Sequence, residues 1–72
     1  MSYYPRLKDL REDKDLKQED IAKLIGTDQS YYAKYENGKR PIPFERIIQL
    51  ADFYDVSIDY IAGRTNNKNI NK

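Results

Sequence analysis

The segment from Gln18 to Arg40 constrains the fold most, because its pattern predicts two short helices joined by a tight turn: QEDIAKLIGTDQSYYAKYENGKR. Glycine adopts the left-handed backbone that such a turn needs and that side chains resist, so we expect the first helix to end at Gly26. That helix carries an apolar stripe at amphipathic spacing, formed by Ile21, Ala22, Leu24 and Ile25.

The second helix of the pair should begin after Asp28, whose carboxylate can accept backbone N–H groups of the first turn. Asn37 and Gly38 should end it, since glycine is common just beyond a helix C-terminus. The residues expected to face inward are Tyr32, Ala33 and Tyr35. Those expected to face outward are Gln29, Ser30, Tyr31 and Lys34.

A short amphipathic helix is predicted before this pair, over about residues 6–14 and directly after Pro5. Leu7 and Leu10 should be its buried residues. Asp15 suits the turn that follows, because aspartate tolerates the left-handed region better than most residues.

Two more helices are predicted after the pair. Pro43 should occupy the first position of one, and Ser57 should cap another that stops at Gly63. The first of these has a broad apolar face, formed by Phe44, Ile47, Ile48, Leu50, Ala51 and Tyr54.

Together, these segments predict a single all-α domain. The chain has 72 residues, no internal repeat and no alternation typical of a strand, so we expect a compact five-helix bundle. Residues 1–5 should form an N-terminal extension, residues 6–63 the folded domain, and residues 64–72 a polar, disordered tail.

The composition excludes several classes of function. The chain has no cysteine and no histidine, which excludes a disulfide framework, a zinc site and histidine-based catalysis, so no cofactor is expected. No apolar run approaches the roughly 20 residues that span a bilayer, and we expect a soluble, cytoplasmic protein without a membrane partner. A small core without a nucleophile motif or phosphate loop predicts neither an enzyme nor a small-molecule site.

Charge is unevenly distributed although the net charge is only +1. Residues 42–63 are predominantly acidic and are not expected to meet phosphate. A local positive edge is predicted from Lys34, Lys39 and Arg40, which Glu36 opposes. Taken without their context, these three cations would be read as ordinary solvated surface charge.

In their order and spacing, four segments resemble the Cro/repressor-type, or XRE, helix-turn-helix family: RLKDLRED, QEDIAKLIG, QSYYAKYENGKR and IIQLADFYDVSIDYIAG. The likeness covers about residues 6–63 and implies a lambda-repressor-like fold. Its third helix, over about residues 28–36, would lie in the DNA major groove, which is about 12 Å wide and admits one helix. The implied function is a transcriptional regulator, in the first place a repressor, that binds a pseudo-palindromic operator in double-stranded DNA.

The resemblance also implies roles for individual residues. Contacts to base edges would come from Gln29, Ser30, Tyr31 and Lys34, with the Gln29 amide suited to adenine and Lys34 to guanine. Contacts to the DNA backbone would come from Lys17, Gln18, Asn37, Lys39 and Arg40. A salt bridge between Arg11 and Glu36 would join the first helix to the end of the third.

Such regulators usually act as homodimers, whose recognition helices would lie about 34 Å apart. We expect Phe53, Ile58 and Tyr60 at the dimer interface, because one small core cannot accommodate them all, although they could simply be apolar surface residues. A different reading is also open. The near-neutral charge and the acidic region would suit a protein-interaction module of the antitoxin or antirepressor type.

Overall fold

Five short helices account for most of the chain, as predicted. The computed structural model describes residues 4–68, and in this part the chain forms no strand. The helices are α1 (Arg6–Asp13), α2 (Gln18–Ile25), α3 (Gln29–Glu36), α4 (Phe44–Tyr54) and α5 (Ile58–Ile61). Each predicted helix is therefore present, with its ends within one or two residues of the expected positions.

Local signals in the sequence explain where the helices begin and end. The Asp28 carboxylate accepts the Tyr31 N–H at 2.8 Å, and the Ser57 hydroxyl accepts the Tyr60 N–H at 2.9 Å, so both predicted caps are confirmed. Gly26 ends α2 with φ +83°, and Asp15 takes φ +56° in the turn after α1. Pro43 precedes the first residue of α4 rather than starting that helix.

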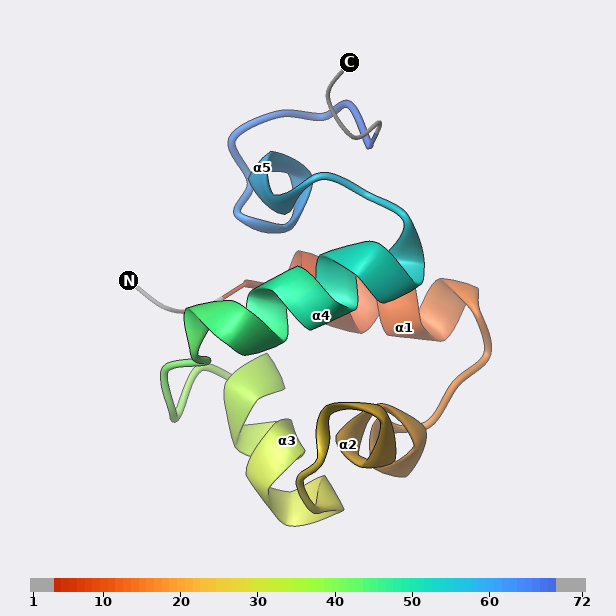
Figure 1. Cartoon of the computed structure of the whole chain (residues 1–72), viewed down its shortest axis with the longest axis vertical. Helices are drawn as coiled ribbons and strands as arrows, with labels where there is room; N and C mark the ends of the chain where they lie inside the picture. The colour runs from red at the N-terminus through yellow and green to blue at the C-terminus, as the bar shows by residue number, and fades with distance from the viewer. Residues whose placement is uncertain (1–3, 69–72) are drawn as a thin grey trace.

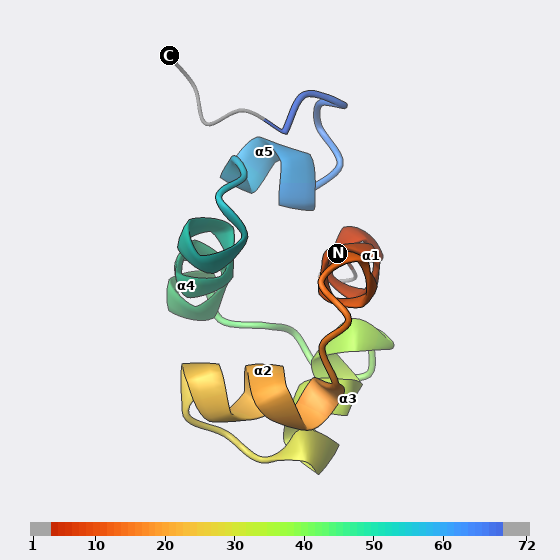
Figure 2. The same cartoon turned by 90° about the vertical axis from the view of Figure 1, so that its right-hand side faces the viewer.

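The bundle has two ends, which differ in what they contain. Helices α1 and α4 run across the middle of the molecule on opposite sides (Figures 1 and 2). The α2–α3 pair lies at one end of them, and α5 with the C-terminal segment lies at the other. This arrangement leaves the outer side of α3 without a covering helix.

The core lies between these helices and draws on all five. Its most fully buried large side chains belong to Leu7, Ile21, Tyr32, Leu50 and Ile61. Tyr35 is also buried, so the two tyrosines that were predicted to face inward from the third helix do so. Burial of aromatic side chains contributes strongly to the stability of so small a domain.

Some apolar residues that were expected in the core are not buried. Leu24 is 43% exposed, Phe44 is 62% exposed and Ile48 is 38% exposed, while Ala33 is only half-buried. The helical wheel explains Leu24, because it lies about 100° from the centre of the stripe that Ile21, Ala22 and Ile25 bury. Phe44 and Ile48 extend the apolar face of α4 beyond the surface that a five-helix domain can cover.

The segment after α5 differs from the expected disordered tail over the residues that the structure describes. The Arg6 side chain donates hydrogen bonds to the carbonyls of Tyr60 and Thr65 and to the Asn66 side chain. The Lys68 carbonyl accepts the Ser57 N–H at 2.9 Å. These bonds hold residues 64–68 against the bundle. The rest of the predicted extension and tail, residues 1–3 and 69–72, lies outside the described residues.

Candidate functional site

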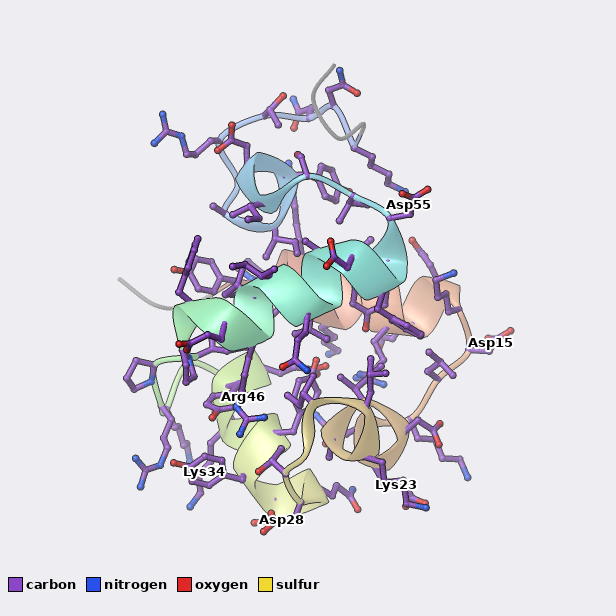
Figure 3. The ribbon with its side chains drawn as sticks, in the orientation of Figure 1. Asp15, Lys23, Asp28, Lys34, Arg46 and Asp55 are labelled. Carbon is purple, nitrogen blue, oxygen red and sulfur yellow. The ribbon has the colours of Figure 1, made fainter. Side chains whose placement is uncertain are left out.

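The pairing of α2 with α3 sets the position of the exposed helix. After the glycine turn, the Thr27 N–H donates to the Ala22 carbonyl at 2.8 Å, which closes the end of α2 and directs the chain into α3. Arg46, on α4, donates a hydrogen bond to the Ile25 carbonyl and so ties this turn to the rest of the bundle. Figure 3 shows the Arg46 side chain extending from α4 toward the α2–α3 end.

The outer side of α3 presents polar side chains to solvent. Gln29, Ser30 and Lys34 are exposed, whereas Tyr31 is half-buried. Asp28 and Lys34 point away from the bundle at this end of the molecule (Figure 3). On the opposite side of the helix, Tyr32 and Tyr35 are buried in the core. The helix thus has one face anchored and one face open.

An ion pair holds the end of α3 to α1. The Arg11 Nε lies 2.7 Å from Glu36 Oε2, and the side chains are 11% and 4% exposed. A second guanidinium nitrogen donates to Glu36 Oε1 at 3.1 Å, and a third donates to the Leu16 carbonyl at 2.9 Å. The pair predicted from the family resemblance is therefore present, in the bidentate geometry that favours strong carboxylate binding.

Gln18, the first residue of α2, completes this cluster. Its amide nitrogen donates to Glu36 Oε1 at 3.1 Å. Burial by itself raises the pKa of Glu36, but the hydrogen bonds from Arg11 and Gln18 outweigh that effect and hold the pKa below its ordinary value. The hydrogen bond to Glu36 raises the pKa of the Arg11 guanidinium. Both groups remain charged, and they fix α3 relative to α1 and α2.

The chain reverses direction after α3. Gly38 has φ +80°, and the Lys34 carbonyl accepts the N–H groups of Lys39 and Arg40 at 2.9 and 3.2 Å. Asn37 Oδ1 also accepts the Lys39 N–H, at 3.1 Å. These bonds bring the two cations, both exposed, back beside the last turn of the helix.

The residues expected at the DNA backbone thus differ in their availability. The side chains of Lys17, Lys39 and Arg40 are exposed. The Gln18 amide instead takes part in the buried cluster around Glu36. The Asn37 oxygen is used in the turn. The three exposed cations can therefore contact phosphate without rearrangement, whereas Gln18 and Asn37 already use their side-chain amides within the protein.

Sequence reasoning missed the role of Arg46. It is half-buried, and its bond to the Ile25 carbonyl satisfies a group at the end of α2 that has no partner within the helix. A lone arginine in an otherwise acidic stretch was the available signal, but its target could not be inferred from spacing.

The three residues expected at a dimer interface lie in different surroundings. Phe53 is 40% exposed on α4 and lies about 140° around that helix from Ile48, with the Lys14 amine 6.0 Å from its ring centroid. Tyr60 is half-buried under the Arg6 guanidinium, 4.2 Å from its ring centroid. Ile58 instead lines two adjoining hollows together with Ile48 and Phe44.

No cluster of acidic side chains in residues 4–68 could hold a metal ion. None of the five helices has the length and apolar character needed to cross a membrane.

The sequence matches one family model, described as helix-turn-helix, over residues 7–61. The match spans α1 to α5 and includes the α2–α3 pair, the glycine turn and the ion pair of Arg11 with Glu36.

Several curated proteins are similar to this chain. YobD, an HTH-type transcriptional regulator of Bacillus subtilis, is 41% identical over 63 residues, which cover 88% of this chain and 56% of that protein. The cryptic phage CTXphi transcriptional repressor RstR of Vibrio cholerae is 40% identical over 53 residues, covering 74% and 48%. The HTH-type transcriptional regulator AnsR of Bacillus subtilis is 38% identical over 63 residues, covering 88% and 54%. The chain spans about half the length of these relatives. No solved structure matches it significantly.

Proposed function

The chain belongs to the helix-turn-helix family of the Cro/repressor, or XRE, type, and from that premise we propose that it regulates transcription by binding a specific DNA sequence through α3. One observation carries the proposal. Gln29, Ser30 and Lys34 form an exposed polar face on a helix whose opposite side is anchored in the core. A rigid, single exposed helix is what the major groove of B-DNA accommodates.

Base recognition is assigned to the first turn of α3 and to Lys34 in its last turn. The Gln29 amide can donate to and accept from adenine at the same time, and Lys34, one turn after Ser30, can donate to guanine O6 or N7. Ser30 can donate or accept beside them. The Asp28 carboxylate caps the helix, and its negative charge would repel phosphate, so Asp28 is not assigned to the interface.

Backbone contacts are assigned to the cations around α3. Lys17, Lys39 and Arg40 are exposed, and neutralising phosphates with such residues supplies affinity that falls as salt rises. These contacts orient the helix but carry no sequence information. The proposed mechanism needs no catalysis, because a bound domain represses by occupying its operator; the relative RstR is named a repressor.

Dimerisation is part of the proposal, with a revised surface. The exposed side chains of Phe44 and Ile48 and the half-buried Ile58 form the apolar part of a surface over α4 and α5, whose two hollows are also lined by Asp52, Asp59 and Arg64. Exposed apolar surface of this kind is typical of an interface, and a twofold dimer would read a pseudo-palindrome. Of the residues named from sequence, Ile58 alone lines this surface.

Selection of bound duplexes from a random pool, followed by titration of the selected duplex and of a random one, tests the proposal. We expect the selected duplex to bind at least about a thousandfold more tightly, with affinity falling as salt rises. Gln29→Ala should remove about 1–3 kcal/mol of discrimination at one base pair. Glu19→Ala, an exposed residue outside the proposed interface, is the matched control. Binding that lacks any sequence preference, or a preference that Gln29→Ala leaves intact, would overturn the assignment.

A further inference from the structure

Tyr31 makes contacts within the protein that a residue free to read bases would not make. Its ring packs edge to face against Tyr35, with the centroids 5.4 Å apart and the planes at 78°. Tyr35 is itself 2% exposed, so Tyr31 rests on the core. On its other side, the Arg40 guanidinium carbon lies 4.9 Å from the Tyr31 centroid, within the range of a cation–π contact.

The backbone brings Arg40 to this position. The left-handed turn at Gly38 and the Arg40 N–H bond to the Lys34 carbonyl return the chain to the side of α3, rather than letting it run on in the helix direction. The Arg40 side chain therefore reaches back along the helix to Tyr31 from a fixed origin. Both ends of the arginine are restrained, the backbone by a hydrogen bond and the guanidinium by a ring.

No carboxylate of residues 4–68 pairs with the Arg40 guanidinium in this arrangement. Among residues 4–68 the ion pairs are Arg11 with Glu36 and Arg64 with Asp59, and the Arg40 guanidinium donates no hydrogen bond to the protein there. A ring contact leaves the N–H donors of a guanidinium available, and their planar fork matches the oxygens of a phosphate.

We propose that Tyr31 is a positioning residue: its ring holds the Arg40 guanidinium beside the exposed face of α3, where Arg40 binds a DNA phosphate next to the bases that α3 reads. This inference rests on the proposed function and assigns Tyr31 a role different from the base contact expected from sequence. Restraining the long arginine side chain before binding lowers the conformational entropy that the complex would otherwise lose.

A double-mutant cycle of Tyr31→Leu and Arg40→Gln, with Tyr31→Phe as the matched control, tests the proposal. Each variant is titrated with the selected duplex and with a random duplex at several salt concentrations. We expect Tyr31→Phe to bind as the wild type does, since it keeps the ring. Arg40→Gln should weaken binding to both duplexes about tenfold and reduce the slope of log affinity against log salt by about one per bound chain.

Tyr31→Leu should weaken both duplexes by about threefold or more and change the salt slope in the same direction. The double variant should be no weaker than Arg40→Gln alone, because the ring acts through the arginine. Additive losses would overturn the proposal, and so would a Tyr31→Leu loss confined to the selected duplex, which is the mark of direct base reading.

An NMR measurement on the free protein separates a folding defect from the proposed contact. The side-chain resonances of Arg40 should be displaced by the ring current in the wild type and in Tyr31→Phe, and should return to ordinary positions in Tyr31→Leu. Undisplaced Arg40 resonances in the wild type would overturn the contact. If the wild type binds no duplex, the proposed function fails and takes this inference with it, whereas a wild type that binds with additive losses removes only the inference.

Discussion

Arg11 on α1 and Glu36 at the end of α3 meet through two hydrogen bonds, 2.7 and 3.1 Å long, although they are 25 residues apart in the chain. The pair is almost fully buried and also holds the Gln18 amide and the Leu16 carbonyl. A buried pair of this kind stabilises less than its geometry suggests, because both charges lose water, but losing one partner leaves the other charge uncompensated.

Glu36→Ala should therefore be among the most damaging substitutions in the chain. We expect a loss of about 3–5 kcal/mol in the free energy of unfolding, measured by urea denaturation followed by circular dichroism. Asp59→Asn is the matched control, since the Arg64–Asp59 pair is 3.7 Å long and well exposed, and it should cost less than about 1 kcal/mol. Equal effects of the two substitutions would contradict the role assigned to the buried pair.

Acid should weaken the same link. The pKa of Glu36 in the folded chain lies below its ordinary value of about 4.3, so its stabilising contribution is complete above that value and is lost as the pH falls through the lower, folded pKa. The measurement is the difference in unfolding free energy between wild type and Glu36→Gln from pH 7 to pH 3. This difference should stay constant down to about pH 5 and shrink below it. A difference that does not change with pH would show that Glu36 has an unshifted pKa.

Gly26→Ala should destabilise the domain through the backbone alone. A Cβ atom at this position would meet no atom within 4 Å, but φ is +83°, where side chains are strained. We expect a loss of about 1–2 kcal/mol, read as a lowered melting temperature. Gly63→Ala offers a matched comparison, with φ +80° and equally open surroundings. A cost well above 3 kcal/mol at Gly26 would point to a steric clash instead.

Phe44→Lys should disrupt self-association if the apolar surface over α4 and α5 joins two copies. Phe44 is 62% exposed, so the substitution should leave the fold intact while raising the dimer dissociation constant about tenfold or more. Sedimentation velocity over a concentration series measures it. Leu24→Lys, which alters an apolar residue that is 43% exposed on α2, should leave association unchanged. A wild type that stays monomeric at high concentration would rule out this interface.

The helices could be predicted because their ends are encoded locally. Asp28 and Ser57 cap their own helices, and Gly26, Gly38 and Asp15 take the left-handed backbone that short-range chemistry favours at those positions. The exposure of Phe44, Ile48 and Leu24 could not be predicted in this way. An apolar pattern shows which face of a helix prefers burial, but not how much of that face its neighbours can cover.

In the candidate site, too, the direction of the side chains could be predicted but their partners could not. The outward direction of Gln29, Ser30 and Lys34 follows from helical periodicity and agrees with their exposure. The partners of Gln18 and Arg46 depend on where distant segments meet, and no spacing along the chain reveals that. The contact of Arg40 with Tyr31 is local, but it depends on the backbone path of the turn after α3. The bridge between Arg11 and Glu36 was anticipated only through the likeness to a family.

The bonds of Arg6 bear on where the cooperative unit of this protein ends. The family match stops at residues 7 and 61, yet Arg6 lies before that stretch and bonds to Thr65 and Asn66 beyond it. A version trimmed to the matched borders would keep every helix residue but Arg6 and lose this clasp, leaving α5, a single turn, to fray first. In native-state hydrogen exchange, the amides of α5 should then open well before those of α4.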